Sequence, residues 1–359
     1  MRSTEIQSTP SPDPIFQMAT GFWVSKTLMT AVELEVFTKL AGKSVNIDQL
    51  QSLLEIENRP TEAFVTALVS LGLIEKIRTD TPNGSETLYS NSQLADLFLD
   101  KGKPSSYMGD FIIMLEKQSY RRWDKLPQSV KTNKPIEDIE GGRGGAGTMF
   151  DQARSNQAIE QMQVFTKAMY GVSVGPAMAL TRIFDFSNYK KMMDIGGGSG
   201  VYAIEVVKEN PKMFATVLDL GPACAVANQY IKQFSLENRI QTKILDYFNE
   251  PFPKDCDVAL LSHIIHLYDQ EKATALLKKV YDSLPNKHGI VIISEWLLND
   301  DKTGPAPSAL MSLNMVLELE RGRNYSFAEI SKMLTAVGFK SIEKRPLAGP
   351  AEIVIGYKK

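Results

Sequence analysis

The sequence predicts an α/β protein with a doubly wound, mainly parallel sheet, preceded by a winged-helix region. Two observations predict the sheet. From Lys191 onward, short apolar runs alternate with stretches of helical periodicity, which is typical of repeated β-α-β units. Residues 193–200 then combine an apolar strand end, an acid and alternate glycines, a pattern that brings backbone close to a nucleotide-like ligand.

The N-terminal part is predicted to be helical and then winged. Residues 1–14 are rich in Ser, Thr and Pro, and we expect a flexible tail there. Apolar residues recur at helical spacing over residues 28–40 and 63–71. Residues 73–77 and 87–89, separated by a Pro-Asn-Gly turn, then predict a β-hairpin, which completes a winged helix.

The middle of the chain is predicted to be helical over residues 107–127 and 149–184, with a solvated linker at 134–147. A glycine-rich stretch can bind phosphate, but no strand precedes this one and no Lys-Ser or Lys-Thr pair follows it. Seven strands are expected after it, at residues 192–195, 215–218, 241–245, 258–261, 290–294, 340–345 and 352–357.

The glycine motif distinguishes between kinds of nucleotide ligand. A dinucleotide fingerprint that began at Gly196 would need glycine at position 201, where the chain has Val. Instead Gly196, Gly198 and Gly200 follow Asp194, whose carboxylate can hold an ammonium group. The motif therefore favours a ligand other than a dinucleotide.

Further polar residues stand at predicted strand ends. Asp219 ends the next strand at about the ~20-residue distance where β-α-β units place an acid on ribose hydroxyls. Asp246, Ser262 and Glu295 also follow strands. Because ligands of such sheets bind at the carboxyl ends of the strands, we expect these residues to line one site.

The sequence resembles the S-adenosylmethionine-dependent O-methyltransferases of the caffeic acid and acetylserotonin type, including bacterial members that act on natural-product phenols. The resemblance is carried by the glycine motif, by Asp219 and by the segments 246–248 and 262–271. The resemblance runs from about residue 22 to residue 358. It implies a Rossmann-like class I methyltransferase sheet and S-adenosylmethionine as the cofactor, with S-adenosylhomocysteine as its product. It also implies that the winged helix serves homodimerisation.

The expected domains are a tail (1–14), a dimerisation domain (15–120), a helical connector that contributes to the acceptor pocket (121–185) and a catalytic domain (186–359). The resemblance implies the following cofactor residues: Ser173, Asp194, Gly196, Gly198, Gly200, Asp219, Leu220, Asp246, Tyr247 and Ser262. It implies these acceptor-pocket residues: Met162, Phe165, Met169, Met311 and Met315. Met and Phe at helical spacing are equally often plain core residues, so both interpretations stay open for each.

His266 falls on the catalytic histidine of the family. A neutral imidazole can take the proton of a phenol, whose pKa is about 10, and the phenolate is a far better nucleophile. The resemblance implies that Glu295 orients this histidine, and it places Asn324 where the family has another orienting acid. His263 is a weaker rival for the base. No metal is expected, because no Cys, Glu or third His follows the two histidines at ligand spacing.

The composition gives no indication of a nucleic-acid-binding or membrane protein. With 40 basic and 42 acidic residues the net charge is −2, which gives no reason to expect binding to nucleic acid or membrane. No apolar stretch approaches the ~20 residues of a membrane span, and two cysteines suit a reducing cytoplasm.

Several alternatives to O-methylation stay open: methylation of carbon or nitrogen, and hydroxylation or decarboxylation on the same fold. A cofactor-sensing regulator that binds DNA through the winged helix is disfavoured, because residues 61–71 contain no Lys or Arg.

Overall fold

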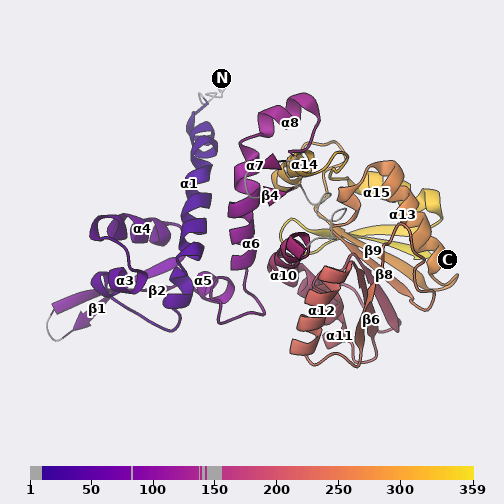
Figure 1. The fold of residues 1–359 in the computed structure, drawn as a ribbon, viewed down its shortest axis with the longest axis horizontal. Helices are drawn as coiled ribbons and strands as arrows, with labels where there is room; N and C mark the ends of the chain where they lie inside the picture. Colours follow the sequence, from indigo (N-terminus) through magenta and orange to yellow (C-terminus); the bar gives the residue numbers. More distant parts are fainter. Residues whose placement is uncertain (1–9, 82–83, 137, 140–141, 144–155) are drawn as a thin grey trace, which may run out of the picture. The chain divides into compact units, whose positions relative to one another are not determined.

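The computed structural model describes residues 10–81, 84–136, 138–139, 142–143 and 156–359. The chain forms two compact units, Met1–Glu116 and Lys117–Lys359 (Figure 1). The observed division lies four residues before the expected one at residue 120, and the expected connector belongs to the second unit.

The first unit consists of short helices around one hairpin. Its elements are α1 (Asp13–Glu33), α2 (Val36–Lys39), α3 (Ile47–Leu54), α4 (Asn58–Ser70), β1 (Ile74–Thr81), β2 (Gly84–Asn91), α5 (Gln93–Phe98) and α6 (Gly109–Met114). Strands β1 and β2 pair antiparallel from Ile74 opposite Asn91 to Thr81 opposite Gly84. The hairpin is the expected wing with longer strands, and α4 precedes it as the winged-helix interpretation requires.

Three features of this unit differ from the sequence prediction. Helix α1 begins at Asp13, inside the expected tail, most of which lies outside the described residues. The helix expected over 28–40 is broken at Glu35, whose φ of 56° is left-handed and separates α1 from α2. Helices α3 and α5 were not predicted from apolar spacing, although Asn46 and Ser92 cap them in the usual way.

The second unit holds the sheet and its helices. Its elements are η1 (Leu115–Tyr120, a π-helical turn that starts in the first unit), α7 (Arg121–Trp123), α8 (Leu126–Thr132), β3 (Asp138–Ile139), β4 (Gly142–Arg143), α10 (Asn156–Ile183), β5 (Lys191–Ile195), α11 (Val201–Glu209), β6 (Phe214–Asp219), α12 (Gly221–Gln233), β7 (Ile240–Ile244), β8 (Val258–Ser262), η2 (Ile265–Leu267), α13 (Gln270–Ser283), β9 (Gly289–Glu295), α14 (Ala306–Glu318), α15 (Phe327–Val337), β10 (Lys340–Pro346) and β11 (Glu352–Lys358).

The sheet has seven strands in the order β10-β11-β9-β8-β5-β6-β7. Strands β5 to β9 are parallel, whereas β11 runs antiparallel to β9 and β10 antiparallel to β11. All seven expected strands are present, each with its ends within one residue of the prediction. The predicted doubly wound, mainly parallel sheet is therefore confirmed.

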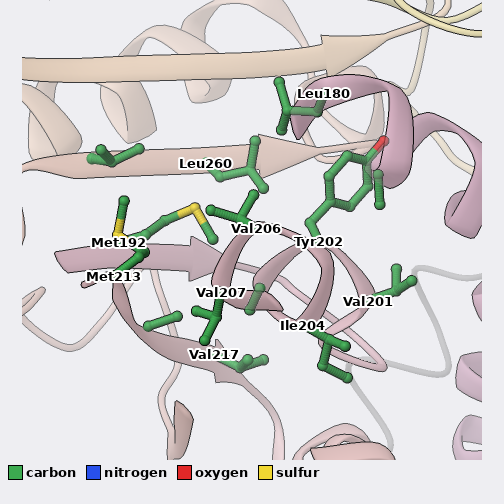
Figure 2. Packing of buried hydrophobic residues seen from close by; sticks show 14 of the residues in the cluster. Leu180, Met192, Val201, Tyr202, Ile204, Val206, Val207, Met213, Val217 and Leu260 are labelled. Carbon is green, nitrogen blue, oxygen red and sulfur yellow. The ribbon is translucent and has the colours of Figure 1, made fainter. Parts of the chain in front are cut away.

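Helices cover both faces of the sheet. On one face α10, α11 and α12 pack on alternate strand residues such as Met192 and Leu260. Figure 2 shows side chains of α11 packed against these strand residues. On the other face α13 and α15 pack on the intervening residues, such as Met193 and Leu261. Because both faces are covered, the central strands β8 and β9 are apolar along almost their whole length, whereas β7 and β10, at the two edges of the sheet, carry polar and exposed residues.

The expected linker at 134–147 contains a short antiparallel ladder, in which β3 pairs with β4. This ladder was not predicted from the sequence, and part of the expected linker lies outside the described residues. None of the described helices is long and apolar enough to cross a membrane.

Candidate active site

The glycine loop, residues 196–200, is the turn from β5 into α11. Gly196, Gly198 and Gly200 have φ values of 65°, 55° and 73°, a left-handed backbone that side chains rarely adopt. A Cβ at Gly196 would also lie 2.3 Å from Cδ1 of Ile264. The three glycines therefore form a tight cradle that a larger residue would close.

Asp194 stands just before this loop and is only 1 % exposed. Neither of its carboxylate oxygens has a hydrogen-bond partner of normal geometry among the described residues. Burial, followed by the charge of Asp219, raises the pKa of Asp194 to about 7, against a smaller lowering effect of the Ala203 amide. A buried carboxyl left without partners is costly, so this position suits a ligand that brings a cation or hydrogen-bond donors.

Asp219 ends β6 and is held by two backbone amides. Gly198 N donates to Oδ2 at 2.8 Å and Leu220 N donates to Oδ1 at 2.7 Å. Burial raises the pKa of Asp219 to about 6 in spite of these bonds. The amides fix the carboxylate against the glycine loop and leave lone pairs on both oxygens for ligand hydroxyls.

The acid and the aromatic residue after β7 have different surroundings. Asp246 stabilises its own turn, where Oδ2 accepts a hydrogen bond from Nδ2 of Asn249 at 2.7 Å. Tyr247 lies beside the glycine loop, since a Cβ at Gly196 would be 3.7 Å from its Cε1. Its hydroxyl is hydrogen-bonded to the hydroxyl of Tyr268. Of the two expected adenine contacts, Tyr247 is the one placed at the cradle, and Asp246 supports the turn.

His266, in the segment after β8, and Glu295, the last residue of β9, are called the histidine–glutamate pair below. Nδ1 of His266 lies 2.6 Å from Oε2 of Glu295, and both side chains are buried. The other oxygen, Oε1, accepts hydrogen bonds from the amides of Ile265 at 2.9 Å and His266 at 3.3 Å. The carboxylate is thus fixed from both sides.

The charge of Glu295 follows from its neighbours. Burial acts to raise the pKa of Glu295, but His266 and His263 outweigh it, and the pKa lies below its usual value. An ionised carboxylate only accepts, so the proton between the two side chains is on Nδ1 of His266. This leaves the lone pair of the histidine on Nε2.

His263 lies next to this pair, with its Nδ1 3.7 Å from Oε2 of Glu295, beyond hydrogen-bond distance. Burial lowers the pKa of His263 to about 4, so its imidazole is neutral at physiological pH. One donor atom of each of His263, His266 and Glu295 lies within 4.8 Å of the other two. The family resemblance implied that Glu295 orients His266, but the cluster with His263 was not predicted, because Glu295 lies 29 residues after His266, far outside the usual spacing of metal ligands along a chain.

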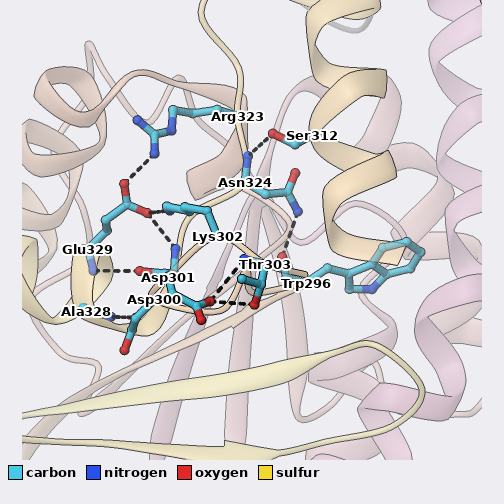
Figure 3. A network of polar contacts seen from close by, with 11 residues as sticks. Trp296, Asp300, Asp301, Lys302, Thr303, Ser312, Arg323, Asn324, Ala328 and Glu329 are labelled. Atoms are coloured by element: carbon cyan, nitrogen blue, oxygen red, sulfur yellow. Dashed lines mark hydrogen bonds and ion pairs between the residues drawn. The ribbon is translucent and has the colours of Figure 1, made fainter. Parts of the chain in front are cut away.

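In the described part of the chain the hydrogen bonds of Asn324 go to groups other than the imidazole. Its Nδ2 donates to the carbonyl oxygen of Trp296 at 2.8 Å, and its backbone N donates to Oγ of Ser312 at 3.3 Å (Figure 3). Its Oδ1 has no hydrogen-bond partner among the described residues. An amide can donate where a carboxylate cannot, and here that donor anchors the residue after Glu295.

The remaining candidates lie on β8 and on two helices. Ser262 ends β8, and its buried Oγ has no hydrogen-bond partner of normal geometry in the described chain, although it interacts with the hydroxyl of Tyr202. Helix α10 carries Ser173 and passes the glycine loop, because a Cβ at Gly198 would be 3.9 Å from Cγ2 of Thr166. Met162 and Met315 are buried, whereas the other three expected pocket residues are partly exposed: Phe165, Met169 and Met311.

One polar residue near the site was missed from the sequence. Tyr202 on α11 is buried, and its hydroxyl lies 3.1 Å from Oγ of Ser294, next to Glu295 (labelled in Figure 2). The sequence feature that could have indicated this residue is a tyrosine in the otherwise apolar first helical turn after the glycine loop. Buried tyrosine hydroxyls usually find a polar partner, and here the partner is on β9.

Comparison with known proteins gives consistent matches along the chain. The O-methyltransferase domain family matches residues 123–340, and the O-methyltransferase dimerisation domain family matches residues 16–101. The 3-hydroxy-5-methyl-1-naphthoate 3-O-methyltransferase of Streptomyces sahachiroi is 32 % identical over 97 % of this chain and 95 % of its own length. The tetracenomycin polyketide synthesis 8-O-methyl transferase of Streptomyces glaucescens is 30 % identical over 97 % of both chains.

A solved structure supports the same family. Human N-acetylserotonin methyltransferase, crystallised in complex with S-adenosylmethionine, matches 100 % of this chain and 99 % of its own, with a TM-score of 0.84 and 26 % identity. The glycine cradle and the unpaired Asp194 carboxyl fit such a ligand. The chain therefore belongs to the S-adenosylmethionine-dependent O-methyltransferases, as its resemblance to that family implied.

Proposed function

We propose that this enzyme methylates a hydroxyl group of a small aromatic acceptor, with His266 as general base and Glu295 as the residue that orients it. The hydrogen bond between Nδ1 of His266 and Oε2 of Glu295 is the observation that carries the proposal. Because the carboxylate holds the proton on Nδ1, Nε2 is free to accept the proton of the acceptor hydroxyl.

The cofactor side of the site is proposed from the residues around the glycine loop. When bound, S-adenosylmethionine supplies an electrophilic methyl group. Asp194 would hold its ammonium group, since this buried carboxyl has no partner in the described protein. Asp219 would accept the ribose hydroxyls on its free lone pairs, and the ring of Tyr247 would contact the adenine beside Gly196.

The base side of the site handles the proton. When Nε2 of His266 takes the hydroxyl proton, the imidazole becomes a cation in a buried position. Glu295 stabilises that cation, because its carboxylate is ionised and already in contact with Nδ1. A positioned base of this kind typically contributes a factor of about 10² to 10⁴ in rate.

An aromatic acceptor is proposed from the helices and from the relatives. Met162, Phe165 and Met169 on α10 and Met311 and Met315 on α14 provide the adaptable apolar walls that suit a flat ring. The named Streptomyces relatives act on a hydroxynaphthoate and in tetracenomycin synthesis. The dimerisation domain supports a homodimer, and two unpaired, buried cysteines are consistent with the cytoplasm.

Methyl transfer from S-adenosylmethionine with a labelled methyl group to a panel of phenols, hydroxynaphthoates and hydroxyindoles tests the proposal. We expect at least one acceptor to be methylated on oxygen, and analysis of the product by NMR identifies the methylated atom. A product methylated on carbon or nitrogen, or turnover of the cofactor without a methylated product, would contradict it.

A further inference from the structure

We propose that His263, His266 and Glu295 form a binding site for one divalent transition-metal ion, with zinc as the best-suited ion, and that the bound metal inhibits methyl transfer. The three donor atoms lie within 4.8 Å of one another at the end of β9 and in the segment after β8. Two imidazoles and one carboxylate are a recurrent ligand set of zinc sites with an open fourth position.

The donor distances suit a small ion. Zinc bonds of about 2.0 to 2.1 Å in a tetrahedral site place neighbouring ligand atoms roughly 3.3 Å apart. The two observed distances to Oε2 of Glu295 are 2.6 Å from Nδ1 of His266 and 3.7 Å from Nδ1 of His263, and they bracket that value. A metal would therefore change those two distances by ~0.7 Å and ~0.4 Å. The donor atoms of the two imidazoles, which lie within 4.8 Å of each other, would also move closer to that spacing.

The surroundings hold the carboxylate in place and leave a route to solvent. The amides of Ile265 and His266 bind Oε1 of Glu295, so Oε2 is presented to both imidazoles in a fixed orientation. The side chain of His263 is 17 % exposed, whereas His266 and Glu295 are almost fully buried. His263 is thus the ligand through which an ion reaches the other two.

The inhibition of methyl transfer by the metal follows from a change in the tautomer of His266. This part of the inference rests on the proposed function, in which His266 is the base. In the resting site Nδ1 carries the proton and Nε2 carries the lone pair that serves as the base. A metal bound at Nδ1 needs that lone pair on Nδ1, so the proton moves to Nε2 of the same neutral ring. The metal then removes the base without occupying the acceptor's place.

A matched pair of variants tests the site in the full-length, chelator-treated protein. His263→Asn removes the imidazole at a left-handed position (φ 56°), and His288→Asn makes the same change at an exposed left-handed position (φ 67°) outside the cluster. Asn tolerates this backbone, so both variants keep the local fold. Titration calorimetry with zinc chloride measures binding, and methyl transfer is measured against zinc concentration relative to each protein's own zinc-free rate.

We expect the wild type and His288→Asn to bind one zinc ion per chain and to lose activity as that site fills, with recovery on addition of chelator. His263→Asn should need at least tenfold more zinc for the same loss. Equal zinc sensitivity in His263→Asn and wild type, or no stoichiometric binding to wild type, overturns the proposal. If zinc-free wild type methylates no hydroxyl, the proposed function fails, while calorimetry still decides the metal site.

Discussion

His266 is the residue on which the proposed chemistry depends most. We expect His266→Ala to lose about two to four orders of magnitude in turnover, because the base is gone while the cofactor residues are unchanged. His263→Ala should lose much less, since its Nδ1 makes no hydrogen bond to Glu295. Single-turnover rates measured from pH 6 to pH 10 separate the two variants.

The pH profile adds an internal control. The wild-type rate should rise with pH and then level off, because a general base acts only in its deprotonated form. The His266→Ala rate should recover in part as the pH approaches the pKa of the acceptor hydroxyl, because solvent then supplies the anion. Chemistry near the wild-type rate in His266→Ala at neutral pH would show that another group takes the proton.

Asp194 makes cofactor binding depend on pH. Its pKa is raised to about 7 by burial and by Asp219, so below that pH the carboxyl keeps a proton that it must release before it can pair with an ammonium group. The affinity for S-adenosylhomocysteine should therefore fall by up to about tenfold per pH unit between pH 7 and pH 6 and be constant above pH 7. Titration calorimetry from pH 5.5 to pH 8.5 measures this.

Asp219 also titrates in this range, because burial raises its pKa to about 6. Asp194→Asn should bind more weakly at pH 8 and retain only the part of the pH dependence that lies around and below pH 6. An affinity of the wild type that does not change across the range would exclude Asp194 as the partner of the ammonium group.

At the residue level the sequence predicted positions better than contacts. Asp219 and Glu295 end parallel strands, and Asp194 is the last residue but one of another. The carboxyl ends of such strands meet at one edge, so the proximity of these residues followed from the strand pattern. The contact of Asn324 with Trp296 depends on side-chain orientation and on the path of a loop, which apolar spacing does not encode. The same holds for the proximity of His263 and Glu295.

Among the elements, α14 is held by buried polar contacts that bear on acceptor binding. Arg122 on α7 forms a buried ion pair with Glu318 at the end of α14, and Nε1 of Trp123 donates to Oδ1 of Asn314 at 3.1 Å. Removal of one partner of a buried ion pair typically costs about 3 to 5 kcal/mol, because the other charge remains buried. These contacts therefore fix the helix that carries Met311 and Met315.

Glu318→Ala should lower the melting temperature and raise the KM for the acceptor, while the affinity for S-adenosylhomocysteine stays within about twofold of wild type, since the cofactor residues lie on other elements. The double variant Arg122→Met with Glu318→Met removes both charges and should regain much of the stability. Thermal melts and steady-state kinetics test both. Equal weakening of cofactor and acceptor binding in Glu318→Ala would show general loosening instead.

The sequence predicted long elements and missed short ones. Strands β5, β6, β8 and β9 are covered on both faces, so each is a continuous apolar run that identifies it. Helices α3 and α5 are only 8 and 6 residues long, too short to establish a periodic apolar pattern. The β3–β4 ladder has two residues in each strand, and strands this short cannot show the alternation of apolar and polar residues that identifies a strand in a sequence.

At the scale of the whole molecule, α1 presents apolar side chains that are exposed among the described residues. The following residues of α1 are between 52 and 74 % exposed: Ile15, Phe16, Met18, Phe22, Trp23 and Val24. An apolar surface of this kind on one helix usually marks an interface. Together with the matched dimerisation domain it supports a homodimer formed through α1.

Replacement of Phe16 and Trp23 by Lys should therefore shift the protein from dimer to monomer at micromolar concentration, as measured by light scattering. Ile77→Lys is the control, because Ile77 is an exposed apolar residue on the wing, outside α1. It should leave the dimer intact. A wild type that is monomeric under these conditions, or a Phe16/Trp23 variant that remains dimeric, would contradict the assignment.

The pairing of β8 with β9 has a consequence for how such enzymes diverge. Ser262 lies opposite Ser294 in the register, so the spacing between the histidine segment and Glu295 is set by backbone hydrogen bonds between two central strands. Helices α10 and α14, which carry the expected acceptor residues, lie outside the sheet. Mutation can therefore alter these helices and change which molecule is methylated while the reaction itself is inherited unchanged, so that one lineage can explore many natural products.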